Sequence, residues 1–346
     1  MAYISFQPSD FFSPTLYTGT GSEITVTGVG FQPDMTWLKD RSATQHHQLY
    51  DSARGAGEVI YPNLSNAEGT VTQQLKSWNS DGYVIGTDGS VNTSSNLYAS
   101  WNWKAGTTSV PSGGTITPTA CSFNTTSGFG IYKYAGNGTD PATIAHGLGV
   151  APKMIIVKKL SGAASWAVGH IAATFDYYAN LNATDQFYDN DGYWSDDAPT
   201  STVFTIGSDG LVNTNAQDYV AYVWAPVKGY SSFGAYTGNG NADGTFVYTG
   251  FRPSLVITKY TSGGGTGGWN IQDDKRNTYN PVDTILSANT DGADSTSSGN
   301  AMDFLSNGFK WRANYSDGNT SGGFFSYAAF AEFPLVSSND MPGVAR

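Results

Sequence analysis

A short phrase, a tyrosine followed by two glycines at alternate positions, occurs three times along the chain. The copies are Tyr17-Thr-Gly-Thr-Gly21, Tyr134-Ala-Gly-Asn-Gly138 and Tyr236-Thr-Gly-Asn-Gly240. Each copy opens a segment of about 100 residues, which is the usual size of a β-sandwich. Self-similarity on this scale predicts that the chain folds as repeated structural units.

Three further markers follow each copy of the phrase in the same order. The first is a glycine, a proline and a lysine, found as Gly30/Pro33/Lys39, Gly149/Pro152/Lys158 and Gly250/Pro253/Lys259. The second is an amide followed by a carboxylate, found as Asn63 and Glu68, Asn180 and Asp185, and Asn289 and Asp294. The third is an aromatic phrase, found as Tyr98-Ala-Ser-Trp101, Tyr219-Val-Ala-Tyr222 and Tyr327-Ala-Ala-Phe330. The constant order predicts three copies of one folding plan.

Each copy is expected to contain a central strand and a closing strand. The central strand follows the proline, as in Met154-Ile-Ile-Val157, where consecutive apolar residues indicate that both faces are covered. The closing strand alternates, so that Ala99, Trp101 and Trp103 share one face. We therefore predict an all-β fold of three tandem antiparallel β-sandwich domains, each with its own hydrophobic interior. The expected domains are residues 1–110 with an N-terminal arm, 111–229, and 230–346 with a C-terminal tail.

Asp-Gly and Asn-Gly pairs between apolar runs are the strongest short signal for a β-hairpin. We expect such turns at Asp81-Gly82, Asp88-Gly89, Asp209-Gly210, Asn307-Gly308 and Asp317-Gly318. No segment has a convincing amphipathic helical pattern. Residues 66–78 come nearest, but their glycine, valine and threonines lower the helical propensity.

The composition excludes several classes of partner. With 17 basic and 28 acidic residues the chain carries a net charge of −11, which disfavours nucleic acid and anionic membrane surfaces. The single cysteine, Cys121, allows no internal disulfide. The apolar runs are far shorter than the roughly 20 residues of a membrane span. The first residues do not show the basic region followed by an apolar region that is typical of a signal peptide.

The residue types that enzymes use do not form a catalytic pattern here. A retaining glycosidase needs two carboxylates about 5 to 5.5 Å apart, yet the four glutamates are scattered singly. His46 and His47 are adjacent, so on a strand they point to opposite faces and cannot share a metal. We therefore expect no enzymatic activity, no catalytic residues, no metal and no cofactor.

Two short patterns hold charged residues at a fixed spacing. Asp51-Ser-Ala-Arg54 and Asp273-Asp-Lys-Arg276 stand at equivalent places in copies one and three, and His170 takes the aspartate position in copy two. An aspartate and an arginine at this spacing favour an ion pair that braces a turn over a ligand site.

The segment after Asp185 is longer in copy two than in the other copies and is rich in aromatic and Asp/Asn residues. It contains Phe187-Tyr188-Asp-Asn-Asp-Gly-Tyr193-Trp194. Ring faces stack on sugar C–H groups, while carboxylates and amides bind hydroxyls, so a sugar-binding surface is one interpretation. The other is that the rings fill an interface between domains. The candidate ligand-binding residues are Tyr188, Asp189, Asp191, Tyr193 and Trp194.

The repeated phrases resemble a family of uncharacterised virion or tail proteins that is frequent in marine bacteriophages. The resemblance rests on Tyr17-Thr-Gly-Thr-Gly21, Gly28-Val-Gly-Phe-Gln-Pro-Asp34, Trp37-Leu-Lys39, Leu49-Tyr-Asp-Ser-Ala-Arg-Gly55, Tyr236-Thr-Gly-Asn-Gly-Asn-Ala-Asp-Gly-Thr-Phe-Val-Tyr-Thr-Gly-Phe251 and Phe330-Ala-Glu-Phe-Pro-Leu335. It implies tandem lectin-like sandwiches of jelly-roll, concanavalin or SPRY type, and it attaches no catalytic residues to them. The copy-two segment from Asp185 to Trp194 departs from the family pattern.

These observations lead to the hypothesis of a non-enzymatic phage structural protein that recognises a host-surface glycan, as part of a tail fibre, tail tip or spike. The expected partners are other virion proteins and host cell-surface polysaccharide, with no nucleic acid and no membrane insertion. A homo-oligomer, by analogy a trimer, is expected in the virion. The alternatives are a capsid decoration or vertex protein, attached through its terminal segments, and a polysaccharide-degrading enzyme.

Overall fold

The fold is all-β, with 42% of the residues in strands and 6% in helices. The structure is a computed structural model that describes residues 4–263 and 265–334. All strand pairs with a named register are antiparallel, and they form several separate sheets. In the described part of the chain, the helices are too short to traverse a lipid bilayer.

Unit 1 holds the first nine strands. The larger sheet, which we call the inner sheet because it contributes to a cluster shared with the other units, has the order β1-β9-β3-β4. The smaller, outer sheet has the order β2-β8-β7. The elements are η1 (Pro8–Asp10), β1 (Phe12–Thr18), β2 (Ile24–Val26), β3 (Met35–Asp40), β4 (Gln48–Asp51), β5 (Glu58–Val59), β6 (Gly69–Thr70), β7 (Leu75–Asn79), β8 (Gly82–Ile85), α1 (Gly89–Asn92) and β9 (Leu97–Trp103).

Unit 2 repeats this arrangement with a longer inner sheet. Its order is β10-β11-β18-β13-β14-β15-β16, and the outer sheet is the pair β12-β17. The elements are β10 (Ala120–Asn124), β11 (Phe129–Ala135), β12 (Ala142–Ala145), β13 (Met154–Lys159), β14 (Trp166–His170), η2 (Ile171–Ala173), β15 (Tyr177–Asn180), β16 (Tyr188–Asp189), α2 (Asp191–Trp194), β17 (Val203–Ile206) and β18 (Asp218–Trp224).

Unit 3 has the inner order β19-β27-β21-β22-β23-β24 and the outer order β20-β26-β25. The elements are β19 (Ser231–Thr237), β20 (Phe246–Tyr248), β21 (Phe251–Ser262), β22 (Asn270–Asp273), β23 (Thr284–Ser287), β24 (Ser295–Thr296), η3 (Ser298–Asn300), β25 (Met302–Leu305), β26 (Gly308–Trp311), α3 (Ser316–Asn319) and β27 (Phe324–Pro334). The units follow the sequence repeats, and the predicted domain boundaries stay a prediction.

The predicted central and closing strands are confirmed. β3, β13 and β21 each lie between two neighbours in an inner sheet, as their continuous apolar runs indicated. The paired strands β9, β18 and β27 are the closing strands. The N-terminal arm was predicted to lie outside the repeated plan, but Phe12–Thr18 forms β1 and pairs along all of β9, as β11 does with β18.

The hairpin prediction is right at two of the five places. Asp81-Gly82 and Asn307-Gly308 turn the hairpins β7–β8 and β25–β26. Asp88 instead begins α1, because its carboxylate accepts the Ser90 N–H and caps a helical turn. Asp209-Gly210 lies in an equivalent turn and Asp317-Gly318 lies inside α3, so these three predictions were wrong.

The tyrosine–glycine phrase has a structural cause that is the same in all three units. The tyrosine hydroxyl donates to a main-chain carbonyl in or next to the short helical turn: Val91 O, Val212 O and Gly318 O. The first glycine of each phrase packs against a threonine carbonyl two residues after the one that the tyrosine binds: Thr93 O, Thr214 O or Thr320 O. A Cβ atom on the glycine would lie only 2.2–2.3 Å from that oxygen. A buried asparagine then binds the loop backbone: Asn92, Asn213 and Asn319. The phrase therefore marks the joint between the inner sheet and the helical turn.

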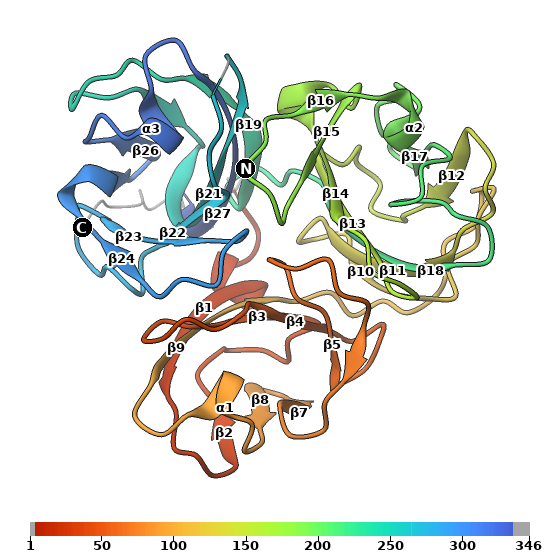
Figure 1. The fold of residues 1–346 in the computed structure, drawn as a ribbon, viewed down its shortest axis with the longest axis horizontal. Coiled ribbons are helices and arrows are strands. Elements are labelled where there is room, and N and C mark those ends of the chain that lie inside the picture. The colour runs from red at the N-terminus through yellow and green to blue at the C-terminus, as the bar shows by residue number, and fades with distance from the viewer. Residues whose placement is uncertain (1–3, 264, 335–346) are drawn as a thin grey trace.

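The three units close into a ring around a shared centre (Figure 1). Each unit has a hydrophobic cluster of its own. A fourth cluster takes residues from all three inner sheets, including Trp101, Tyr222 and Phe330 of the closing strands. The prediction of entirely independent interiors was therefore wrong. Each inner sheet has one face on the cluster of its own unit and the other face on one core common to all three units.

The same hydrogen bonds recur at each contact between units, which we call seams 1–2, 2–3 and 1–3. One backbone bond joins Glu68 N–H to Leu160 O, Phe187 N–H to Thr261 O, and Asp294 N–H to Arg41 O. A second joins Ala164 to Ser65, Gly267 to Thr184, and Gln45 to Asp291. A ring nitrogen in each unit also reaches a neighbour's carbonyl: Trp166 to Tyr61, Trp269 to Asn180, and His47 to Ser287. The constant direction of these bonds around the molecule closes the ring.

The repeated lysine of the central strand is buried in every unit. Lys39, Lys158 and Lys259 have no exposed surface, and each ammonium donates to main-chain carbonyls, as Lys158 Nζ does to Lys159 O at 2.7 Å. Burial lowers the pKa of each lysine to about 8. These side chains bind the carbonyls of Asp40, Lys159 and Gly267.

Raising the pH from 7.5 to 9 is expected to increase the free energy of unfolding. The folded lysines release their protons near pH 8, whereas the unfolded ones keep them to about pH 10.4, so the unfolded chain binds more protons and stability rises with pH. The gain should be about 1 kcal/mol per lysine. The gain in the free energy of unfolding is measured by urea unfolding at each pH. The measurements stay below about pH 10, because tyrosines of the unfolded chain ionise near that pH and lower the stability.

A matched pair of variants tests this assignment. Lys158→Met should lower the gain by the about 1 kcal/mol that one lysine contributes, whereas the partly exposed Lys76, changed to Met, should leave the gain as it is. A stability that falls between pH 7.5 and 9 would contradict the prediction.

Candidate functional site

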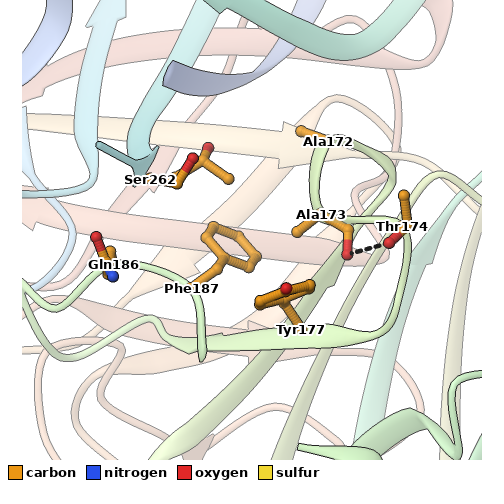
Figure 2. A pocket seen from close by; sticks show the side chains of 8 residues that line it. Ala172, Ala173, Thr174, Tyr177, Gln186, Phe187 and Ser262 are labelled. Carbon is orange, nitrogen blue, oxygen red and sulfur yellow. Dashed lines mark hydrogen bonds between the residues drawn. The ribbon is translucent and has the colours of Figure 1, made fainter. Parts of the chain in front are cut away.

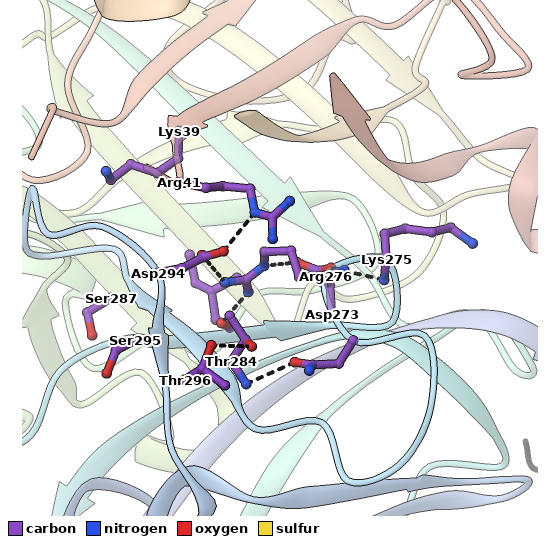
Figure 3. A network of polar contacts seen from close by, with 12 residues as sticks. Lys39, Arg41, Asp273, Lys275, Arg276, Thr284, Ser287, Asp294, Ser295 and Thr296 are labelled. Carbon is purple, nitrogen blue, oxygen red and sulfur yellow. Dashed lines mark hydrogen bonds and ion pairs between the residues drawn. The ribbon is translucent and has the colours of Figure 1, made fainter. Parts of the chain in front are cut away.

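Seams 1–2 and 1–3 each enclose a buried cluster of charges. The predicted Asp–Arg pairs are confirmed as ion pairs: Arg54 Nε lies 2.5 Å from Asp51, and Arg276 Nε lies 2.6 Å from Asp273. In both units the guanidinium also contacts the repeat carboxylate at 3.0 Å, Glu68 in unit 1 and Asp294 in unit 3. Figure 3 shows the unit 3 cluster with Arg41 reaching Asp294 from unit 1. The spacing predicted the pair but not the third member.

The neighbouring unit completes each cluster with a hydrogen-bond donor from its closing strand. The Tyr222 hydroxyl donates to Asp51 at 2.6 Å, and the Trp101 indole donates to Asp273 at 3.1 Å. Burial alone would raise the pKa of Asp273, but the Arg276 charge and the N–H donors hold it below its usual value. In both clusters the arginine contacts two carboxylates, and the aspartate also accepts a hydrogen bond from the neighbouring unit.

Seam 2–3 lacks this cluster entirely. His170 stands where the other units have aspartate, since its partner on the central strand lies two residues after the repeat proline, as do the partners of Asp51 and Asp273. Ala173 follows at the arginine position. The His170 Nδ1 accepts the Ala172 N–H, so Nε2 carries the proton and donates to Tyr327 O at 3.1 Å. Burial lowers the pKa of His170 to about 4, which keeps the ring neutral at neutral pH.

The predicted register of the amide and carboxylate markers was wrong in copy two. Asn182, not Asn180, accepts a hydrogen bond from the backbone N–H of Trp166. In the other units Asn63 accepts from the N–H of His47, and Asn289 accepts from the N–H of Trp269. The residue at the carboxylate position is therefore Phe187 rather than Asp185. A phenyl ring replaces a charge that would have had no arginine to pair with.

A pocket of about 330 Å³ opens where the charged cluster is missing (Figure 2). It is lined by Ala172, Ala173, Thr174, Tyr177, Gln186, Phe187, Thr261 and Ser262. Phe187 is buried and Tyr177 is 39% exposed, and both rings border the same space. The buried Oε1 atom of Gln186 has no hydrogen-bond partner. The pocket thus combines two aromatic rings with amide and hydroxyl groups.

The five predicted ligand-binding residues do not form one surface. Tyr193 and Trp194 are buried in α2, within the hydrophobic cluster of unit 2, and the Tyr193 ring stacks on Tyr178 at 3.6 Å. A surface role therefore does not extend to these two. Tyr188 and Asp189 lie exposed on β16, and Asp191 lies exposed at the start of α2.

The pocket borders this predicted segment without coinciding with it. Asp189 is the cross-strand partner of Tyr177, and Phe187 directly precedes β16. Tyr177 and Gln186 carried no sequence signal, because neither belongs to a repeated marker. Comparison of the copies at the Asp51, Arg54 and Glu68 positions would have found Phe187. In the described part of the chain, no three His, Cys, Asp or Glu residues are grouped to hold a metal ion.

Removing the carboxylate of a complete cluster is expected to destabilise the ring. Asp273→Asn leaves the buried Arg276 without its main counter-charge, which should cost about 3–5 kcal/mol in the free energy of unfolding. The matched control is Asp303→Asn, since Asp303 pairs with the half-exposed Arg312 at 3.4 Å and should cost at most about 1 kcal/mol. Equal losses in urea unfolding would show that the buried cluster contributes no more than a surface pair.

Comparison with known proteins gives one match. No curated protein and no solved structure showed significant similarity to the chain. One family, described as a domain of unknown function (DUF7483), matches residues 7–334, a range that includes all three units and seams. The match treats the ring as one module. The chain therefore belongs to the DUF7483 family.

Proposed function

We propose that this chain is a non-enzymatic structural protein of a bacteriophage particle that binds a glycan on the host surface. In this proposal it is part of a tail fibre, tail tip or spike. The observation that carries the binding role is the seam 2–3 pocket, where Tyr177 and Phe187 border a cavity of about 330 Å³ beside an unpartnered amide oxygen. This volume lies at the small end of ligand pockets, which span about 300–1,000 Å³.

The chemistry of the lining supports a sugar as the ligand. The two rings offer apolar faces for sugar C–H groups, and Gln186, Thr174 and Ser262 offer acceptors and donors for hydroxyls. The pocket lies between units that are joined by backbone hydrogen bonds, so its walls are held at a fixed separation. A preformed site binds with a smaller entropic cost.

The finer description of the fold belongs to the same proposal. We interpret the units as three tandem lectin-like jelly-roll sandwiches, because each packs an inner sheet and a smaller outer sheet around its own cluster. The virion location, the virion partners and a homo-oligomer, by analogy a trimer, are further parts of it. The C-terminal attachment segment, residues 337–346, lies outside the described residues.

The proposal is tested with purified protein as a competitor for host adsorption of the phage that encodes it. The wild-type chain should reduce adsorption and bind immobilised host polysaccharide. Ala173→Arg should abolish both effects, because the new side chain fills the pocket as Arg54 and Arg276 fill the equivalent space in the other units. The matched control is Ala242→Arg, at an exposed loop position of unit 3.

Each contrary outcome identifies an alternative. Full competition by Ala173→Arg would place the binding site elsewhere, and no competition by the wild type would reject host recognition. Density for the chain on the capsid lattice in averaged particle images would favour a decoration or vertex protein. Release of reducing sugar from host polysaccharide would indicate a degrading enzyme.

A further inference from the structure

One more exposed ring stands beside the seam 2–3 pocket. Phe324 begins β27 and is 50% exposed, and its cross-strand partner is the lining residue Ser262. β21 has a bulge between Tyr260 and Ser262, so the direction of Phe324 is taken from alternation along β27, where neighbouring side chains point to opposite faces. Phe324 therefore lies on the pocket side of the inner sheet, whereas Phe325 points into the core of unit 3.

Comparison of the three units shows what is particular about this position. The first residue of each closing strand lies at the edge of a seam and is exposed: Leu97, Asp218 and Phe324. Each is held beside the segment that follows a central strand, through Arg41 N–H to Leu97 O, Leu160 N–H to Asp218 O, and the Ser262–Phe324 pairing. An aromatic ring occurs only at seam 2–3, where the charged cluster is replaced by a pocket.

The charges around the pocket limit the ligand further. None of the eight lining side chains is charged, so a carboxylate, sulfate or phosphate group would be desolvated without a counter-ion. Two negative charges border the pocket: Thr174 Oγ1 donates to Asp176 at 2.7 Å, and Asp189 lies opposite Tyr177. Partial desolvation and the charges of Asp176, Asp189 and other aspartates raise the pKa of nearby Asp196. The oxygen of Gln186 has no hydrogen-bond donor, and a sugar hydroxyl supplies one.

Resting on the proposed function, we infer that the pocket and Phe324 form one site for an uncharged glycan chain of at least two sugar rings. The first ring lies between Tyr177 and Phe187. The next stacks on Phe324 across the seam, so that the chain contacts units 2 and 3 together. Phe324 is then a specificity residue for chain length, and the acidic surroundings reject uronic acids and sulfated sugars.

The test is calorimetric titration of the full chain with monomers and their linear tetramers. The probes are glucose and cellotetraose, N-acetylglucosamine and chitotetraose, and galacturonic acid and tetragalacturonic acid. A neutral tetramer should bind about three- to tenfold more tightly than its monomer, because one aromatic contact contributes an affinity gain in this range. The galacturonic acid pair should bind most weakly.

The variants separate a subsite from a merely structural ring. Phe324→Ala should lower the affinity for the neutral tetramer to that of the monomer and leave the affinity for the monomer unchanged, and Phe324→Trp should restore the difference. Leu97→Ala, the matched position in unit 1, should change neither affinity.

The inference and the proposed function fail in different ways. A tetramer-to-monomer ratio that Phe324→Ala leaves unchanged, or tetragalacturonic acid binding as tightly as a neutral tetramer, overturns the inference. In both cases sugar binding that Ala173→Arg abolishes still supports the proposed function. Wild-type protein that binds none of the six probes overturns the inference, and if it also fails to compete for adsorption the proposed function falls with it.

Discussion

The hydrophobic cluster shared by the three units is the constraint on which the rest of the structure depends. It buries the second face of every inner sheet, so alternate residues of a closing strand must serve two cores. In β18, Val220, Tyr222 and Trp224 enter the shared cluster, while Tyr219, Ala221 and Val223 fill the interior of unit 2. A sheet covered on both faces needs near-continuous apolar strands, and it turns every polar group at the seams into a buried group that requires a partner.

The seams show how that requirement is met in two ways. Where an aspartate is buried, an arginine, a second carboxylate and a donor from the next closing strand accompany it. Where His170 takes its place, the closing strand of the next unit offers Phe330, which has no donor, and the histidine binds the Tyr327 carbonyl instead. Seam 1–3, which joins units that are not consecutive in the chain, carries the additional ion pair between Arg41 and Asp294. Each substitution is matched by one across the seam.

The sequence predicted the features that depend on local patterns. Apolar runs and alternation identified the central and closing strands, and spacing identified the Asp–Arg pairs. It missed the copy-two register because the marker relied on a carboxylate, which Phe187 replaces. It mistook the Asp88 turn for a hairpin because an Asp-Gly pair also caps helical turns. Aromatic content could not separate the buried Tyr193 and Trp194 from the exposed Tyr177, since that depends on contacts between segments distant in the chain.

The cyclic pattern of hydrogen bonds is the one that three identical subunits around an axis would make. In such a homotrimer every interface has the same residues, so a substitution that opens a cavity opens it three times and removes all of the ionic clusters at once. Joining the three units in one polypeptide lifts this restriction. Two interfaces can keep the charged residues that hold the assembly together, while the third diverges freely. The broken symmetry, with one seam unlike the other two, is open to a fused chain and closed to a homotrimer.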